Sequence, residues 1–512
     1  MRKFYLALAS GLLLSFSWPS IGYFPFIFFA FIPLLIAERE CVSGKQIFAY
    51  SFFSFFLFNL ITTYWIYHAT LFGAVAAFVI NASLMSIVFL LFHKVRRITS
   101  DRIGYMFFVF IWISMEYLHL NWQLSWPWLT IGNVFADFHL IVQWYEYTGF
   151  LGGSFWVLLL NILFFLIIQG KYTKHLIMVL ISVFILPIIT SIIMYFNNEF
   201  IRKDTINVVI VQPNIDPYNE KFRVNFEDQL DQFISLAKNN LNESTQLLLG
   251  PETALLENIW EGKINNSYSI KALRDLQSDF PNLNILIGAT TYKLITSIDD
   301  RTETSRKMLN YDYFYDIYNS AIFIHDSTDI DVYHKTKLVP GVEKMPFPKL
   351  LDPLVKFAVD LGGIAGSLGK DNLNNTFSTS NTVIRPLICY ESVYGDLGGG
   401  KSNLISIITN DGWWKNTAGY KQHFSYASLR AIENRRWIVR SANTGISGVI
   451  NEKGDVIRKT DWNQAVSFEE QVSLFNVNTF YNIYGDYIGR IAVFISFLLI
   501  AISFTKNKIS VK

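Results

Sequence analysis

The sequence predicts a membrane-embedded α-helical bundle of about eight spans joined to one large α/β domain, and its composition and charge distribution lead to that fold class. Of the 512 residues, 16% are charged and 16% are aromatic, whereas soluble domains are about 25% charged. Residues 1–199 hold only seven of the 41 acidic and ten of the 43 basic residues, while residues 200–484 hold 33 and 29. We therefore expect a membrane block of seven spans over 1–199, an external domain over 200–484, and an eighth span with a cytoplasmic tail over 485–512.

The same composition excludes other classes of protein. A formal net charge of +2 does not suit a nucleic-acid-binding protein, which neutralises phosphates with a large excess of basic residues. Two cysteines exclude a disulfide scaffold and a multi-cysteine zinc site. A hydrophobic content of 51% excludes a disordered chain.

Apolar runs define the elements of the membrane block in chain order. A helix of about 20 residues crosses the hydrocarbon core. Two shorter runs, 4–18 and 24–37, flank Trp18 and Pro19. A signal peptide is the alternative for the first run, but Ser-Trp-Pro-Ser is a poor cleavage site, so we expect two short or tilted spans. The runs of full spanning length are 46–67, 71–93, 104–120, 139–169, 175–197 and 488–504.

The basic residues of the block predict its orientation, because cytoplasmic loops carry an excess of Lys and Arg. All ten lie at the N-terminus or in alternate loops, and the loops at 19–23, 68–70 and 121–138 carry none. An even number of spans places the C-terminal lysines on the same side. We therefore expect both termini in the cytoplasm and residues 200–484 on the periplasmic side of a bacterial inner (cytoplasmic) membrane.

The two cysteines are predicted to lie on opposite sides of the membrane, so they cannot pair. Cys41 falls in a cytoplasmic loop and Cys389 in the external domain. A single thiol in an oxidising compartment is open to oxidation, which favours a chemical role for Cys389. A buried, inert cysteine is the alternative.

Short β-branched runs alternate with amphipathic stretches through the external domain, which predicts an α/β fold with helices covering sheets. Helical periodicity covers 222–242 and 420–436. The predicted buried strands cover 207–212, 247–251, 284–288, 321–324, 383–389, 404–409 and 437–440.

Three segments of this domain place a chemically capable residue at the end of a strand: Glu252 after Gly250-Pro251, Lys335 after Tyr333-His334, and Cys389 after Ile388. Strand ends are where α/β folds assemble their sites. A cysteine needs a base because its free pKa is about 8.5, and Glu252 could supply it while Lys335 stabilises a thiolate or an oxyanion. Taken singly, a glutamate after proline is usually a helix-start charge, and a lysine before Leu-Val-Pro is usually solvated.

In this order, the three residues resemble the Glu-Lys-Cys triad of the nitrilase (carbon–nitrogen hydrolase) superfamily. Eight spans with one external nitrilase-like domain resemble, more narrowly, the apolipoprotein N-acyltransferase family. The resemblance covers nearly the whole chain and implies a nitrilase-like αββα sandwich. Further matching segments are Pro127-Trp128, Gly132, Gln143, Gly149, Gln212, Asn214-Ile215, Tyr318-Asn319-Ser320, Asn410-Asp411-Gly412-Trp413, Gln422-His423, Arg430-Ala431-Ile432-Glu433-Asn434, Arg440-Ser441-Ala442-Asn443-Thr444-Gly445 and Gly454.

The resemblance implies an N-acyltransferase that moves a fatty acyl chain from a glycerophospholipid to the N-terminal α-amine of S-diacylglyceryl-cysteine lipoproteins. In this ping-pong reaction Cys389 would carry the acyl group as a thioester, and Glu252 would act as base and acid. Lys335 and the Tyr390 backbone N–H would stabilise the oxyanion. The implied partners are the phospholipid donor, the diacylated apolipoprotein acceptor and the membrane, with no nucleic acid, for a monomer that needs no metal or organic cofactor.

Two glutamates are expected to support the triad, and two positions depart from the family pattern. By the resemblance, Glu343 and Glu391 orient Lys335 and the triad rather than exchange protons. The family often has Leu-Val-Pro-Phe-Gly-Glu, whereas residues 338–343 are Leu-Val-Pro-Gly-Val-Glu, so the turn before Glu343 differs. A tryptophan often found after the opening strand is Phe222 here, which keeps an aromatic ring for lipid contact but loses the indole N–H.

For several other residues, a structural role competes with a functional one. We expect a structural hydrogen bond for His423, with a Cys–His pairing as the alternative. Glu116 lies inside a predicted span, where it must face protein or water, and we expect it to form a structural hydrogen bond. Trp413-Trp414 and the apolar stretch 345–368 suit an ordinary core, with a mobile lipid-contacting arm as the alternative.

The sequence leaves two rival functions open. A membrane-tethered amidase or nitrilase would use the same triad but let water take the acyl group. A non-catalytic membrane scaffold or transporter would carry an inactive external domain, although the shortage of charged residues within the spans argues against a transporter.

Overall fold

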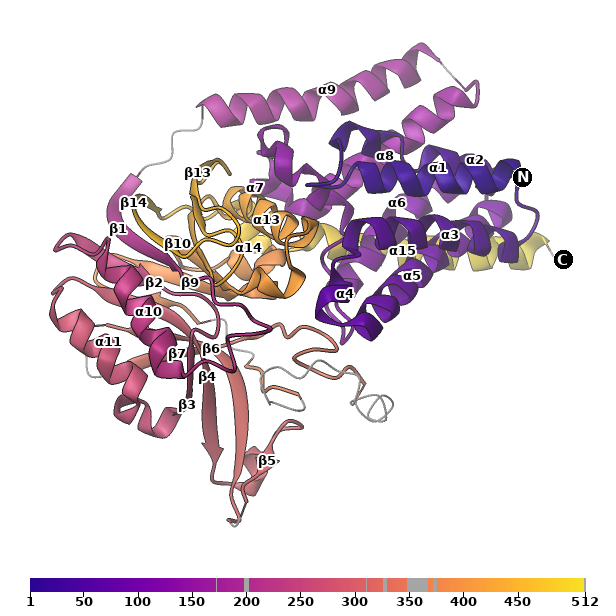
Figure 1. Cartoon of the computed structure of the whole chain (residues 1–512). Helices are drawn as coiled ribbons and strands as arrows, with labels where there is room; N and C mark the ends of the chain where they lie inside the picture. The colour runs from indigo at the N-terminus through magenta and orange to yellow at the C-terminus, as the bar shows by residue number, and fades with distance from the viewer. Residues whose placement is uncertain are drawn as a thin grey trace. The chain divides into compact units, whose positions relative to one another are not determined.

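The computed structural model describes residues 1–171, 173–197, 202–309, 311–325, 329–347, 367–371 and 375–510. The chain forms two compact units, one made of Met1–Asn198 with Thr479–Lys512 and the other of Glu199–Asn478 (Figure 1). The first unit is helical and the second contains both β-sheets. We call them the helical unit and the α/β unit.

Among the described residues, six helices of the helical unit are long and apolar enough to cross a membrane, and each overlaps one of the six full-length runs predicted from the sequence. The run predicted at 139–169 is divided, because only Phe150–Ile168 forms the long helix and the residues before it lie in two shorter elements. They are α3 (Gly44–Thr63), α5 (Leu71–Ile98), α6 (Asp101–Leu120), α8 (Phe150–Ile168), α9 (Lys174–Asn197) and α15 (Tyr487–Ser510). The shorter elements are α1 (Arg2–Phe16), η1 (Phe24–Phe28), α2 (Ile32–Glu40), α4 (Ile66–Ala69), η2 (Ile131–Val142), α7 (Tyr145–Thr148) and α14 (Phe480–Tyr484).

The two shorter apolar runs, which were predicted as two of the eight spans, do not form helices of full spanning length. The run at 4–18 forms α1, which has 15 residues and is about 22 Å long at 1.5 Å per residue, less than the roughly 30 Å hydrocarbon core. The run at 24–37 is divided between η1 and α2, each of which has a proline in its first two positions. Proline begins helices well and interrupts their interiors, because it lacks the N–H and its ring clashes with the preceding turn.

Polar side chains inside the helical unit pair with one another. Glu116 is buried, and its Oε1 accepts hydrogen bonds from Trp112 Nε1 at 2.9 Å and from the Ile131 N–H at 2.8 Å, which is the structural role predicted for it. Asn81 joins Asn59 at 2.8 Å and His119 at 3.0 Å across α3, α5 and α6. Such pairing satisfies groups that would otherwise be costly in an apolar environment.

The α/β unit contains two sheets. The eight-stranded sheet has the order β14-β1-β2-β4-β6-β5, with β3 paired to β4 and β7 paired to β6. Its strands are β1 (Arg202–Gln212), β2 (Thr245–Leu249), β3 (Leu255–Trp260), β4 (Asn284–Ile295), β5 (Arg306–Lys307), β6 (Phe314–Ile324), β7 (Ile330–His334) and β14 (Val466–Phe475). The six-stranded sheet has the order β13-β12-β11-β10-β9-β8, from β8 (Phe377–Ser378), β9 (Val383–Ile388), β10 (Leu404–Thr409), β11 (Trp437–Ala442), β12 (Gly448–Ile450) and β13 (Val456–Lys459).

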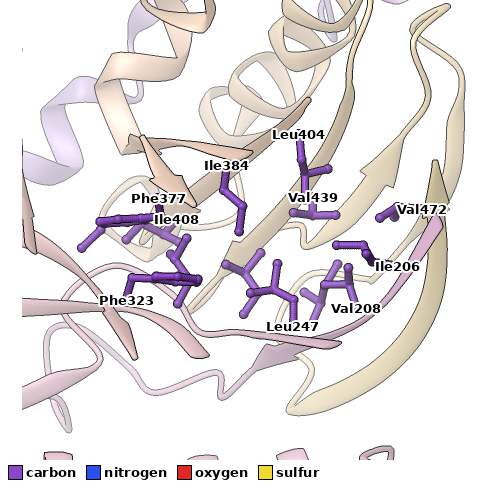
Figure 2. Close-up of a cluster of buried hydrophobic side chains, with 14 of the residues drawn as sticks. Ile206, Val208, Leu247, Phe323, Phe377, Ile384, Leu404, Ile408, Val439 and Val472 are labelled. Carbon is purple, nitrogen blue, oxygen red and sulfur yellow. The ribbon is translucent and has the colours of Figure 1, made fainter. Parts of the chain in front are cut away.

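The two sheets pack face to face. Figure 2 shows Ile206, Val208 and Leu247 of the larger sheet against side chains of the smaller one, including Leu404 and Val439, in one buried cluster. Because side chains alternate along a strand, the intervening residues of β1 point to the opposite face. That face is covered by α10 (Phe226–Lys238) and α11 (Tyr268–Ser278).

Helix α13 (Ala418–Asn434) packs on β11 and β12 of the smaller sheet and completes the outer layer on that side. The layers therefore run helix, sheet, sheet, helix, which confirms the predicted αββα sandwich. All seven predicted strands and both predicted helices are present. The prediction missed α11 and the strands β3, β5, β8 and β12 to β14, because these elements are short or lack a continuous apolar run.

The sheet topology brings strand ends together. Strand β2 is parallel to β1 and β4, and β9 and β10 are parallel neighbours. The carboxyl ends of parallel strands lie at one edge of a sheet, where the following loops converge. Glu252 follows β2, Cys389 follows β9, and Asn410 follows β10.

Candidate active site

Glu252 lies in a tight turn that a close backbone approach holds in place. A Cβ atom at Gly288 would lie 2.6 Å from the Glu252 Cα and 2.6 Å from the Pro251 oxygen, so only glycine fits at position 288 without a shift. The Gly288 N–H donates to Pro251 O at 3.0 Å, and the Ala254 N–H donates to Gly288 O at 2.9 Å. Glu252 is 7% exposed. The turn therefore presents the carboxylate from a rigid strand end.

Lys335 comes directly after β7 and lies between two carboxylates. Its backbone N–H donates to Asn319 O at 2.9 Å, which continues the β6–β7 pairing. Its Nζ donates to Glu343 Oε1 at 2.8 Å and to Glu252 Oε1 at 3.2 Å. Burial by itself would lower the pKa of Lys335, but the carboxylates of Glu343 and Glu252 outweigh burial and raise it, so the amine stays protonated.

Asn319 is a member of this cluster whose role the sequence analysis missed. Its Nδ2 donates to Glu252 Oε1 at 2.7 Å and to Glu343 Oε1 at 2.9 Å, so it bridges the carboxylates that Lys335 also contacts. The second oxygen of Glu252 accepts from the Asn410 N–H at 3.1 Å. The feature of the sequence that could have revealed this role is an amide side chain in a strand whose residues are mostly buried. A buried polar side chain needs hydrogen-bond partners.

Cys389 begins the 3-10 helix η6 (Cys389–Val393) directly after β9. Its φ is +49°, a left-handed conformation that a non-glycine residue rarely adopts, and such strain is concentrated at functional sites. Burial raises the pKa of the Cys389 thiol, the Glu252 carboxylate raises it further, and the Lys335 ammonium opposes both. The resting group is therefore a thiol that needs a base before it can attack a carbonyl carbon.

Glu391 connects the Cys389 turn to the lysine segment. Its Oε2 accepts from the Ile388 N–H at 2.8 Å, and its Oε1 accepts from the N–H and the hydroxyl of Thr336, each at 2.7 Å. The Tyr333 hydroxyl donates to the same Oε1 at 2.9 Å. A buried carboxylate with this many donors holds the residues on both sides of it in a fixed relation, as expected for a supporting residue.

Glu343 reaches Lys335 through a turn that differs from the family pattern. The Val339 N–H donates to Glu343 Oε2 at 2.8 Å, while Oε1 accepts from Lys335. Gly341 has a φ of +78° and donates its N–H to Lys344 O at 2.8 Å. A glycine accommodates this conformation without strain, so the sequence Gly341-Val342 still delivers Glu343 to the lysine.

The other residues that the sequence singled out for this site are Tyr390, Phe222 and the apolar stretch 345–368. The ring of Tyr390 is buried and packs edge-on against Tyr394, with ring centroids 5.4 Å apart. The side chain of Phe222 is 47% exposed. Most of the apolar stretch 345–368, including Gly362-Gly363 and Gly366, lies outside the described residues.

His423 has the structural role that the sequence analysis expected. Its Nδ1 lies 2.9 Å from Asp411 Oδ1, and its Nε2 lies 2.8 Å from Ser392 Oγ and 3.1 Å from the backbone oxygen of Cys389. Burial opposes ionisation of Asp411, but Arg440 and His423 outweigh it and lower the pKa of that carboxyl. The histidine thus buttresses the Cys389 turn through its backbone.

The arrangement combines a thiol, a carboxylate and a protonated amine in one buried cluster. A carboxylate can take the thiol proton, and an ammonium can stabilise negative charge on oxygen, so the cluster suits nucleophilic attack on a carbonyl group. Within the described part of the chain, no group of three or more His, Cys, Asp and Glu residues is arranged to hold a metal ion.

Two family models match this chain, one within each of its two structural units. Residues 207–471 match the family model for carbon–nitrogen hydrolases, and residues 10–163 match the model for the N-terminal domain of apolipoprotein N-acyltransferase. The chain therefore belongs to the carbon–nitrogen hydrolase family. Its N-terminal part is similar to the N-terminal domain of apolipoprotein N-acyltransferase. The six long apolar helices of the described residues and the N-acyltransferase relatives reported below support a membrane protein.

Relatives named apolipoprotein N-acyltransferase align along nearly the whole chain. The one from Chlorobaculum tepidum is 25% identical over 99% of this chain and 97% of its own length. The one from Geobacter metallireducens is 26% identical over 99% of this chain and 96% of its own. Among solved structures, an amidase from Nesterenkonia sp. is 14% identical, with 57% of this chain and 98% of that chain covered at a TM-score of 0.36.

Proposed function

We propose that this protein transfers a fatty acyl chain from a glycerophospholipid to the N-terminal α-amine of S-diacylglyceryl-cysteine lipoproteins. The observation that carries the proposal is the buried cluster of Glu252, Lys335 and Cys389 in a chain whose relatives along nearly its whole length are named apolipoprotein N-acyltransferase. A thiol nucleophile suits acyl transfer, because a thioester is reactive enough to acylate an amine.

In the first step the Cys389 thiol attacks the ester carbonyl carbon of the phospholipid while Glu252 accepts the thiol proton. Negative charge develops on the carbonyl oxygen, where Lys335 and the Tyr390 backbone N–H stabilise it. The C–O bond then breaks, and Glu252 returns the proton to the departing oxygen. The products are a lysophospholipid and an acyl thioester on Cys389.

In the second step the α-amine of the diacylated lipoprotein attacks the thioester carbon, and Glu252 takes a proton from the nitrogen. The C–S bond breaks as the amide forms, and the proton passes to the Cys389 sulfur to restore the thiol. Glu343 and Glu391 keep Lys335 and the Cys389 turn in place through both steps. The chain's own residues balance every proton, so the reaction calls for no metal or organic cofactor.

The substrates also define the location that we propose. Both substrates carry acyl chains, so an enzyme that acts on them works at a membrane surface. The Lys and Arg asymmetry of the loops supports a bacterial inner membrane protein with both termini in the cytoplasm and the α/β unit in the periplasm. We propose that it acts as a monomer, because the three triad residues come from one chain.

Mass spectrometry of the purified protein tests the reaction. With phospholipid alone, Cys389 is expected to gain the mass of one fatty acyl chain and to keep it until a diacylglyceryl-cysteine peptide is added. Glu252→Gln removes the base and should prevent the thioester from accumulating. Lys335→Ala removes the oxyanion charge and should slow acylation about 10²-fold or more.

The amidase rival makes the opposite prediction. A hydrolase that uses the same residues would release free fatty acid steadily from phospholipid and would hold no lasting thioester. Such turnover without any peptide would show that water is the acceptor and would overturn the transferase proposal. A wild-type protein that neither forms a thioester nor releases fatty acid would favour the non-catalytic scaffold or transporter.

A further inference from the structure

Lys221 places a second buried amine beside the proposed base. The residue is 3% exposed, and its Nζ donates to Thr253 Oγ1 at 2.5 Å and approaches the backbone oxygen of Glu252 at 3.4 Å. Thr253 has a φ of +46°, so the turn that carries Glu252 is strained at the residue that Lys221 holds. The lysine therefore contacts the turn directly after the carboxylate-bearing residue.

The backbone of Lys221 is fixed from two sides. Its N–H donates to Asp216 O at 2.9 Å, and Gln229 Nε2 of α10 donates to its carbonyl oxygen at 2.9 Å. The Gln229 side chain is itself buried. A side chain anchored in this way is directed into the protein by its surroundings rather than placed there by chance.

Among the described residues, Lys221 forms no ion pair within 4.0 Å. Burial lowers the pKa of Lys221 to about 8, and the Glu252 carboxylate opposes that shift. A buried ammonium without a contacting carboxylate is costly, so a plain structural role would be served better by an apolar residue. The buried charge of Lys221 is therefore better explained by a function than by packing.

The charges of the site suggest what that reason is. Glu252 and Glu343 share the single ammonium of Lys335. Among these three side chains, acidic groups therefore outnumber basic ones. A second positive charge at Lys221 restores the balance on the Glu252 side.

We propose that Lys221 is a positioning residue that holds the Glu252–Thr253 turn and places a second positive charge beside Glu252, the proposed acceptor of the Cys389 proton. The inference rests on the proposed function, because it assigns Glu252 the role of base. The other charged and titratable groups that face Glu252 and Cys389 are Lys335, Glu343 and Asp411. These remain unchanged in the variants below.

Alkylation of Cys389 by iodoacetamide, followed by peptide mass spectrometry as a function of pH, tests this role without any lipid. Lys221→Met removes the charge at similar length and should move the acid limb of the alkylation profile to higher pH by about one unit or more, since an opposite charge nearby lowers a carboxyl pKa. Lys221→Arg keeps the charge and should leave the limb near its wild-type position. Lys238→Met, at the exposed end of α10, is the matched control and should behave as wild type.

A second pair of variants separates the charge from the hydrogen bond. Thr253→Val removes the acceptor but keeps the Lys221 charge, so the alkylation rate should fall while the acid limb stays in place. Lys221→Gln removes the charge but keeps a donor, and it replaces Lys221→Met if that variant does not fold. An acid limb at the wild-type pH in either uncharged variant would overturn the proposal.

The phospholipid assay keeps the two proposals apart. A wild-type protein that alkylates with the expected pH profile but never forms an acyl thioester would remove the proposed function and leave the Glu252–Lys221 relation intact. A wild-type protein that forms the thioester, with Lys221→Met unchanged in both rate and pH profile, would remove only the role of Lys221.

Discussion

Cys389 is buried and held as a thiol, so the residues around it determine whether it can react. The neighbouring carboxylate and ammonium act on the thiol in opposite directions, because the Glu252 charge raises its pKa and the Lys335 charge lowers it. This balance is typical of a nucleophile activated by an adjacent base.

The two cysteines provide the test at this scale. Cys389→Ala should abolish acylation completely, and Cys389→Ser should be nearly inactive, because Glu252 is too weak a base for a hydroxyl group. Cys41 lies in the helical unit, so Cys41→Ala should keep nearly full activity. The measurement is the mass of the protein after incubation with phospholipid. Acylation of the Cys389→Ala variant would contradict the assignment of the nucleophile.

At the scale of elements, the site depends on strand ends and on one close approach between backbones. Strands β2, β7 and β9 each stop immediately before or within three residues of a triad member, so the sheets position all three. Gly288 on β4 lets the turn after β2 lie directly against the sheet. The strands thus carry the precision that a flexible loop would lack.

Gly288→Ala is expected to displace the Glu252 turn, because the added Cβ would lie 2.6 Å from the Glu252 Cα. A shift of this kind should slow acylation about 10²-fold and lower the stability of the α/β unit by about 1–3 kcal/mol. Gly262→Ala is the control, since no heavy atom lies within 4 Å of its added Cβ. Acylation rates and thermal unfolding of the two variants check the prediction, and equal behaviour would contradict it.

At the scale of the whole molecule, the chain joins a unit suited to lipid with a unit suited to water. The helical unit includes residues from both ends of the chain, since Thr479–Lys512 returns to it after the α/β unit. The α/β unit is therefore an insertion between helices of one membrane-embedded body.

Reporter fusions test the predicted orientation. An alkaline phosphatase fused after Asn219 should be active, because that enzyme needs an exported location, whereas a fusion after Lys512 should be inactive. A cytoplasmic reporter at the same two positions should give the reverse pattern. The physical basis is the Lys and Arg bias of the short loops. The same compartment for both fusions would contradict an even number of spans.

Local patterns in the sequence were sufficient for the six long helices, the seven strands and the three strand-end residues. Hydropathy and side-chain alternation repeat over a few residues, so they survive without knowledge of the fold. The same patterns did not predict the interruption of the run at 24–37, because Pro25 and Pro33 act through backbone geometry rather than through hydropathy.

Only the tertiary structure decided which polar groups meet in the cluster. Lys335 and Glu252 are 83 residues apart in the chain, and Lys221 meets Thr253 across 32 residues. A contact of this range depends on which strands lie side by side in one sheet and on where each strand stops, which no short segment encodes. The sequence by itself predicted which residues could do the chemistry and where the six long apolar helices lie. The fold determined that Asn319, Asn410 and Lys221 join the triad, because a polar group in a packed interior takes its partners from whichever strands and loops lie next to it.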